Sequence, residues 1–339
     1  MFPVIDMHCD TISCLNDFKE EQVPGLHLRK NGMHIDLERM KKADYMCQSF
    51  ALFTSLGEVR SRNVSPFVHA QALSDTFDRE IELNKDIIAP VTTATQIEEN
   101  FSKGMMSALK TVEEGAVYEG DVSKLEYFYS KGVRKSTLTW NFENELAYPN
   151  PMINMGNHKY VCDAPDTVHG LKPAGFEMVH AMEDMGVVID VSHLNDAGIW
   201  DILKTVRPST PVIASHSNAR GLMNHLRNLT DDMIRAMADH GGITGINFLG
   251  GFLSPYGAEN KVSRIQDMVA HAKYICNVGG IDFIALGTDF DGIGGDLEVN
   301  GCGEMQKLAE ALLDAGFSND DVEKIFYRNA LRVYHTVLG

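Results

Sequence analysis

Residues 1–10 read MFPVIDMHCD, and they carry the strongest indication of the fold. Val4 and Ile5 are β-formers that predict a buried strand, and this strand runs directly into His8 and Asp10. Side chains at positions i and i+2 of an extended chain point to the same face, so the imidazole and the carboxylate can hold one metal ion together. Such a pair at the carboxyl end of a first strand is typical of barrel metalloenzymes. Because a His-x-Asp pair also occurs by chance, the prediction requires further ligands at later strand ends.

The composition narrows the class of protein. The chain has 339 residues, 44% of them hydrophobic, enough for one large α/β domain or two smaller ones. The formal net charge of −17 argues against nucleic-acid and anionic-membrane partners, because both need basic patches. The sequence shows no basic start followed by an apolar stretch and no long apolar run elsewhere, so we expect a soluble cytoplasmic protein. The six cysteines are scattered without a Cys-x-x-Cys motif, which argues against a zinc finger and a disulfide framework.

Apolar segments that alternate with helical or irregular chain predict an α/β fold, a (β/α)₈ TIM-like barrel in a single domain, residues 1–339. The eight predicted strands cover residues 4–10, 45–53, 105–112, 133–140, 187–193, 211–216, 242–248 and 283–289. A further apolar run at 87–93 is left outside this count. Residues 141–170 are rich in Asn, Pro and Gly, and we expect them to form a lid or a pocket wall. Ser263 and Gln266 match a capping box that would open a helix.

Polar side chains with metal-binding chemistry follow the predicted strands. In a closed parallel barrel the carboxyl ends of all strands meet at one rim, so residues far apart in sequence can share a cleft. Each residue has an ordinary explanation as a strand end, a solvated carboxylate or a turn, and Glu114 is an alternative to Glu113. Together they form a suitable ligand set for two divalent ions, zinc above all. The residues are His8, Asp10, Glu113, His193, His216 and Asp289.

In several short motifs, the chain resembles the membrane (renal) dipeptidase family. The resemblance runs in order from residue 4 to residue 333. It implies a (β/α)₈ barrel with a dinuclear zinc site that hydrolyses dipeptides, in many members also those with a C-terminal D-residue. The matching motifs are DMHCD at 6–10, VE at 112–113, DVSH at 190–193, SHSNA at 215–219, RN at 227–228 and GTDFDG at 287–292.

The resemblance also implies a role for each candidate ligand and two Zn²⁺ ions per chain. His8 and Asp10 match the ligands of one zinc. His193 and His216 match the ligands of the other, and Glu113 matches the bridge. Two zinc ions roughly 3.5–4 Å apart would share a water and present it as a hydroxide to the peptide carbonyl.

Three more residues are assigned to the substrate by the resemblance. Arg227 matches the arginine that binds the substrate carboxylate, which suits a guanidinium because it donates two parallel hydrogen bonds. Asp289 matches the acid beside the substrate amine, and it could instead transfer the proton during hydrolysis. Family members often carry a histidine after Leu-Thr on the fourth strand, whereas this chain has Trp140 there. Because of this difference, the sequence does not determine which group polarises the scissile carbonyl or which substrates are accepted.

We therefore expect a metallo-dipeptidase, in which Glu113 and Asp289 act in catalysis on a small dipeptide. The family implies a homodimer as an option, and neither a nucleic acid nor a membrane is expected as partner. One alternative is an amidohydrolase acting on a cyclic amide or N-acyl amino acid, with Lys135 as a carboxylated bridging lysine. Another is a binding protein on a decayed barrel, which would lack ligands, whereas all five are present.

Overall fold

The computed structural model describes residues 1–20, 26–150, 152–154, 160–162 and 164–339. Its main feature is a closed parallel barrel, because β2 pairs on one edge with β1 and on the other with β4. The predicted (β/α)₈ barrel is thus confirmed. In chain order the barrel strands are β1 (Val4–Cys9), β2 (Tyr45–Phe53), β4 (Met106–Glu113), β5 (Lys135–Thr137), β8 (Val188–Asp190), β9 (Val212–Ala214), β10 (Ile243–Ile246) and β12 (Ile284–Leu286).

The run left outside the predicted count is a strand, but it lies outside the barrel ring. β3 (Ile88–Val91) pairs in parallel with the first half of β4, up to Leu109. β5 pairs with the second half of β4, from Thr111 onward. The two strands therefore share one edge of β4 in succession, and only β5 continues the ring.

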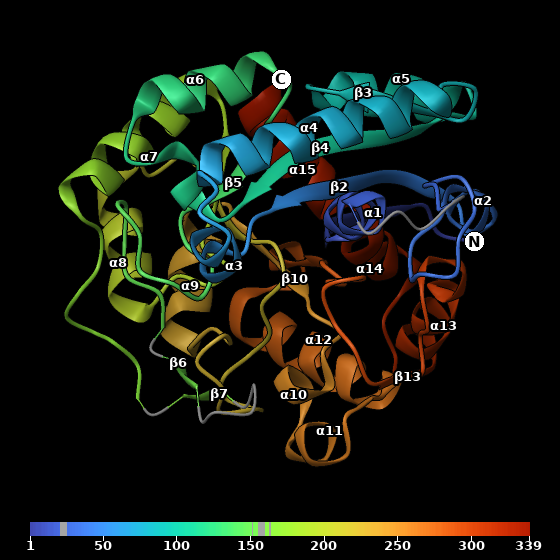
Figure 1. Cartoon of the computed structure of the whole chain (residues 1–339). Coiled ribbons are helices and arrows are strands. Elements are labelled where there is room, and N and C mark those ends of the chain that lie inside the picture. The colour runs from blue at the N-terminus through green and yellow to red at the C-terminus, as the bar shows by residue number, and fades with distance from the viewer. Residues whose placement is uncertain (21–25, 151, 155–159, 163) are drawn as a thin grey trace.

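Helices surround the barrel (Figure 1), and α4 packs against β2 and β3. The larger outer helices are α4 (Pro66–Leu83), α5 (Ala94–Ser102), α6 (Val122–Ser130), α7 (Pro173–Met185), α8 (Asp196–Thr205), α9 (Asp231–Asp239), α12 (Ile265–Gly279), α13 (Gln306–Asp314) and α15 (Asn329–Leu338). Shorter helices and pairings lie in the loops. They are α2 (Leu37–Lys42), α3 (Leu56–Ser61), α10 (Gly250–Leu253), α11 (Pro255–Asn260), α14 (Asn319–Glu323), β11 (Val262–Ser263) and β13 (Asp296–Leu297), while the ten-residue α1 (Thr11–Glu20) directly follows β1.

Local sequence accounts for many helix boundaries. Thr230 accepts a hydrogen bond from the backbone N–H of Met233 and so caps α9, whose first turn carries two aspartates that favour the positive end of the helix dipole. The capping box predicted at Ser263 is wrong. α12 begins at Ile265 after Arg264, and the Ile265 N–H donates to Glu298 Oε2 and not to Ser263, because Ser263 belongs to β11 and pairs with β13.

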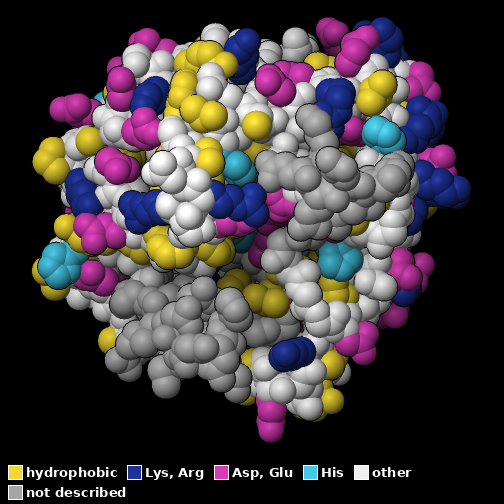
Figure 2. Space-filling view, viewed as in Figure 1, with side chains coloured by type: hydrophobic (Ala, Val, Ile, Leu, Met, Phe, Trp, Pro, Cys, Tyr) yellow, Lys and Arg dark blue, Asp and Glu magenta, His cyan; other side chains and the backbone are white. Residues whose placement is uncertain are grey.

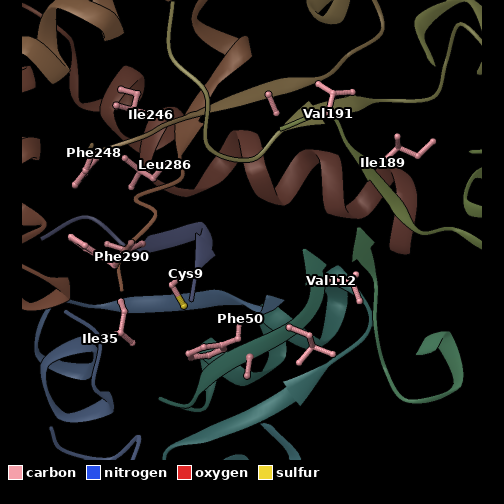
Figure 3. Packing of buried hydrophobic residues seen from close by; sticks show 14 of the residues in the cluster. Cys9, Ile35, Phe50, Val112, Ile189, Val191, Ile246, Phe248, Leu286 and Phe290 are labelled. Atoms are coloured by element: carbon pink, nitrogen blue, oxygen red, sulfur yellow. The ribbon is translucent and has the colours of Figure 1, made fainter. Parts of the chain in front are cut away.

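The larger cluster of buried hydrophobic residues contains side chains from several barrel strands. Cys9, Phe50 and Val112 come from three different strands and belong to one buried cluster (Figure 3). Cys9 is fully buried in that cluster, on the face of β1 opposite to His8, as expected for neighbours in a strand. The outward face of β1 is therefore anchored by packing while the inward face carries the candidate ligands.

Two features concern the surface and the long loop. Acidic and basic side chains are interspersed over the face seen in Figure 2, without one large patch of a single charge. Within the described ranges, no helix combines the length and apolar character needed to cross a membrane. In the predicted lid, β6 (Met152–Asn154) pairs antiparallel with β7 (Tyr160–Cys162), while residues 151, 155–159 and 163 lie outside the described residues.

Candidate metal centre

The carboxyl rim of the barrel brings the candidate ligands together. His8 lies near the end of β1 and Asp10 directly follows it, while Glu113 is the last residue of β4. His193 and His216 lie just beyond β8 and β9. All five side chains are buried. Asp289, in the loop after β12, joins them, with Oδ1 at 4.0 Å from His8 Nε2.

Glu113 lies between two groups of histidines. Its Oε2 is 2.9 Å from His8 Nε2, whereas its Oε1 is 3.0 Å from His193 Nε2 and 3.6 Å from His216 Nε2. Each carboxylate oxygen therefore faces a different side of the site. This is the arrangement that a carboxylate needs in order to bridge two cations.

Three overlapping groups could each hold an ion, and within each group the ligand atoms lie within 4.8 Å of one another. Because Glu113 belongs to two of the groups and His216 to two, the site can accommodate neighbouring ions that share ligands. The groups are His8 with Asp10 and Glu113, Glu113 with His193 and His216, and His8 with His216 and Asp289.

Unsatisfied atoms at the site fit a cation. His8 Nε2 and Asp10 Oδ1 are buried without a hydrogen-bond partner, which is unfavourable in a site that holds no ion. His193 Nδ1 lies 3.0 Å from Asn141 Oδ1 and donates to it, so Nε2 carries a lone pair. That lone pair faces Glu113 Oε1 and, at 3.0 Å, His216 Nε2. A bound cation would satisfy these facing lone pairs.

The ligands differ in protonation. Burial lowers the pKa of His193 to about 4 and that of His216 well below its usual range, which keeps both imidazoles in the neutral form that binds metal. Burial also acts to lower the pKa of His8, but Glu113 and Asp10 outweigh it and raise that pKa well above its usual range. The surroundings therefore shift the pKa of His8 in the opposite direction to the pKa values of the other two histidines.

Carboxylates at the site follow the same electrostatics. Burial acts to raise the pKa of Glu113, but the neighbouring His8 and His193 outweigh it and lower this pKa well below its usual range. Burial raises the pKa of Asp10 to about 6 and that of Asp289 to about 7. A carboxylate with a raised pKa gains from a nearby cation, because the cation stabilises its charged form.

Two buried aspartates hold the strand ends in place, and the first is Asp6. Its Oδ1 accepts a hydrogen bond from the backbone N–H of Thr288 at 2.9 Å, and its Oδ2 accepts one from the Thr288 hydroxyl at 2.7 Å. The backbone N–H of Asp289 in turn donates to the carbonyl of His8 at 3.2 Å. The end of β1 is thereby joined to the loop that carries Asp289.

The second is Asp190, which joins β8 to β9. Its Oδ1 accepts hydrogen bonds from the backbone N–H groups of Ser192 at 3.0 Å and Ser215 at 2.9 Å, each next to a candidate histidine. The buried Nζ of Lys135 lies 3.7 Å from Asp190 Oδ2 and donates to the carbonyl of Met7. The amino group of Lys135 therefore lies beside Asp190 and Met7. The side chain that lies between His8 on one side and His193 and His216 on the other is that of Glu113.

A cavity of about 800 Å³ opens over the ligands, within the size range of small-molecule sites. Arg227 lines one side, where its guanidinium donates to Ser217 Oγ at 3.1 Å and to the carbonyl of His216 at 3.3 Å. Asp289 lines another part, and its Oδ2 accepts from Asn247 Nδ2 at 2.9 Å. A cation and an anion thus lie at separate places around the candidate metal centre.

Trp140 also lines the cavity, as an aromatic wall. Its ring meets Phe53 edge-on, with centroids 5.0 Å apart, and its centroid is 6.0 Å from that of His193. The site therefore contains the eight residues predicted for it, but their catalytic and binding roles stay predictions. Sequence reasoning missed Asn141, because nothing in its spacing distinguishes it from other polar loop residues.

Comparisons with known proteins agree with this geometry. The chain is 32% identical to an uncharacterized Klebsiella pneumoniae protein in the pqqA 5′ region, over 72% of this chain and 87% of that protein. It is 28% identical to an uncharacterized dipeptidase of Schizosaccharomyces pombe, over 99% of this chain and 81% of that protein. Among solved structures, the metallopeptidase dipeptidase AC of family M19 superposes with a TM-score of 0.89 at 22% identity, covering 100% of this chain and 99% of that one.

A further structure and a family model complete the comparison. A metallopeptidase from Rhodobacter sphaeroides, solved with a phosphinate mimic of the dipeptide L-Ala-D-Ala, superposes with a TM-score of 0.88 at 21% identity and covers 99% of both chains. The model of the membrane dipeptidase family matches residues 1–338. The chain therefore belongs to the membrane dipeptidase family, peptidase family M19, and is a metallo-dipeptidase.

Proposed function

We propose that this protein is a zinc-dependent dipeptidase with two Zn²⁺ ions per chain. The position of Glu113, with one oxygen toward His8 and the other toward His193 and His216, is the observation that carries the proposal. Three imidazoles with carboxylates form a donor set that suits zinc. In this proposal His8 and Asp10 hold one ion and the other two histidines hold the second.

The metals and the residues have separate tasks. When bound, the zinc ions supply the Lewis acidity that lowers the pKa of a water and polarises the scissile carbonyl. Arg227 binds the C-terminal carboxylate through charge-assisted hydrogen bonds, which orients the peptide bond over the centre. Asp289 binds the N-terminal ammonium or transfers the proton to the departing amine, and the hydrogen bond from Asn247 orients its carboxylate.

We include substrates with a C-terminal D-residue in this proposal. The Rhodobacter sphaeroides protein with the same fold was solved with a mimic of L-Ala-D-Ala. A carboxylate held by Arg227 fixes the end of the substrate and not the configuration of its α-carbon. We further propose that residues 1–339 work as one cytoplasmic domain, with a homodimer as the assembly. The excess of acidic residues and the free cysteines Cys9, Cys14, Cys47, Cys276 and Cys302 support this environment.

Trp140 keeps a second candidate function open. An indole cannot replace the imidazole that family members often present to the substrate at this position. An amidohydrolase acting on an N-acyl amino acid would still use Arg227 for the carboxylate but would need no group for a free ammonium. This alternative predicts that an N-acetylated substrate is cleaved faster than the corresponding free dipeptide.

The test combines metal analysis with a substrate panel. Protein purified without chelator is analysed for metal by plasma emission and assayed with L-Ala-L-Ala, L-Ala-D-Ala and N-acetyl-L-Ala. We expect about two zinc per chain, as in two-metal hydrolases, and cleavage of the free dipeptides. Two zinc ions with cleavage of only the N-acetyl compound would favour the amidohydrolase. Protein that binds no divalent metal would contradict the site itself.

A further inference from the structure

Glu114 follows the candidate bridge Glu113 but points away from the metal centre. Its side chain is fully buried, and its backbone has φ of 110° and ψ of 112°. A non-glycine residue at such a positive φ is uncommon, and it persists where surrounding contacts hold it. Hydrogen bonds of its carboxylate hold Glu114 in this conformation.

The carboxylate of Glu114 forms hydrogen bonds with the segment that follows β5. Its Oε2 accepts a hydrogen bond from the backbone N–H of Trp140 at 2.9 Å. Its Oε1 accepts from Asn144 Nδ2 at 2.5 Å and from the backbone N–H of Ala116 at 3.1 Å. Asn144 also donates to the carbonyl of Leu138 at 2.7 Å. We call residues 138–147 the strap, since both of its halves are tied to one buried carboxylate.

The strap carries two side chains into the site. Asn141 Oδ1 accepts the hydrogen bond from His193 Nδ1 at 3.0 Å, which directs His193 Nε2 toward Glu113. Trp140 places its indole beside His193 and against Phe53. Movement of the strap would therefore change both the orientation of a candidate ligand and one wall of the cavity.

Trp140 and Arg227 line the same cavity, so in the proposed binding mode this wall lies on the side of the substrate carboxylate. Arg227 donates to the carbonyl of His216, and the Trp140 ring lies 6.0 Å from His193, so both flank the same pair of histidines. A dipeptide whose carboxylate is held by Arg227 has its C-terminal residue on this side. A large indole there leaves less room for the side chain of that residue.

We propose that Glu114 is a positioning residue that holds the strap against the site, so that Trp140 restricts the C-terminal residue of the substrate to a small side chain. The inference rests on the proposed dipeptidase function. It adds a specificity role for Trp140 and a positioning role for a carboxylate that binds neither metal nor substrate.

The first test follows Trp140 without any assay of activity. The chain has two tryptophans, so Trp200→Phe leaves Trp140 as the single emitter. In that background we compare Glu114→Gln and Glu114→Gly, which suits the positive φ, with Glu145→Gln, an exposed position on the same strap. We expect both Glu114 variants to shift Trp140 emission to the red and to increase its quenching by acrylamide, while Glu145→Gln leaves both unchanged. Unchanged emission and quenching in a folded Glu114 variant would overturn the proposal.

The second test measures specificity as the ratio of kcat/KM for L-Ala-L-Ala to that for L-Ala-L-Phe. Removal of the indole in Trp140→Ala, or release of the strap in Glu114→Gly, should lower this ratio about tenfold or more, a change within the range of pocket-size effects. Glu145→Gln should keep the ratio of the parent. An equal loss of kcat/KM for both substrates would indicate a merely structural role and overturn the inference. If the parent cleaves no dipeptide, the proposed function fails, while the fluorescence still decides whether Glu114 holds the strap.

Discussion

The two halves of the candidate metal centre, one with His8 and Asp10 and the other with His193 and His216, are built in different ways. His8 and Asp10 come from one strand end, two residues apart, and Asp6 of the same strand accepts a hydrogen bond from Thr288 in the loop after β12. His193 and His216 come from two strands, and His193 has a positive φ of 72°. The first half is therefore a local arrangement, whereas the second requires two loops to be placed independently.

Their surroundings differ as well. The first half is rich in carboxylates, which raise the pKa of His8, while burial lowers the pKa of both histidines of the second half. The second half depends on Asp190, whose charge is balanced by the buried Lys135, and on Asn141 of the strap. The comparison teaches that one site can combine ligands placed by their spacing in the sequence with ligands placed by contacts between distant segments. Variants of single residues can test the two halves separately.

Removal of the shared residue should have the largest effect. In Glu113→Ala both halves lose a ligand, so we expect binding of both metals and turnover to fall to background. Lys135→Ala is the comparison that tests the alternative bridge, because this buried lysine, which lies 3.7 Å from Asp190, is the other candidate for that role. Metal content by plasma emission and dipeptide hydrolysis decide the outcome. Retention of metal in Glu113→Ala, with its loss in Lys135→Ala, would show that the bridge is the lysine.

Single-histidine variants should separate the halves. His8→Ala removes a ligand from the first half, and His193→Ala or His216→Ala removes one from the second. Each should lose one metal per chain and nearly all turnover, since a two-metal reaction needs both ions. Circular dichroism should show a retained fold. Full activity in either second-half variant would remove that half from the site.

Lys135→Met should lower the free energy of unfolding, because it removes the partner of Asp190, which supports the second half. Removing one partner of a buried ion pair leaves the other charge uncompensated and costs about 3–5 kcal/mol. Lys110→Met is the matched control: that lysine is also buried, but its partner Asp78 is largely exposed to solvent and loses less. Urea unfolding in the presence of chelator measures both variants. Equal losses of unfolding free energy would contradict the special position of Lys135.

Arg227→Met tests the proposed binding of the substrate carboxylate beside the second half, where Arg227 donates to the carbonyl of His216. Loss of a charge-assisted hydrogen bond costs about 1.5–3 kcal/mol, or roughly 10- to 100-fold in binding. We expect KM for dipeptides to rise by this factor and KM for the corresponding dipeptide amides to change little, because the amides lack the carboxylate. Similar changes for both substrate types would exclude the carboxylate role.

Asn141→Ala should give the smallest effect and touch the second half alone. Loss of a hydrogen bond that orients a metal ligand reduces metal affinity by about 10- to 100-fold, and we expect the lower end because His193 is also confined by burial. Titration of metal-free protein with zinc should show one weakened site and one unchanged site. Weakening of both sites would mean that Asn141 supports the centre as a whole.

Much of this architecture could be predicted before the structure. The eight barrel strands follow from apolar segments whose length and alternation are local properties, and the ligands lie at strand ends, which a parallel barrel brings to one rim. His8 and Asp10 needed only the i, i+2 geometry of a strand. The predicted start of α12 was wrong because Ser263 is part of β11, which pairs with β13. A four-residue motif does not show such pairing.

The sequence by itself determined the barrel, the family and the chemical types of the candidate ligands, because periodicity, spacing and residue identity are read along the chain. Only the tertiary structure decided that β3 lies outside the ring, that Lys135 balances Asp190, that Asn141 directs His193 and that Glu114 points away from the centre. These features depend on which groups meet when segments separated by tens of residues pack together. Buried polar groups must find partners across such distances, and no local pattern records which partner each one finds.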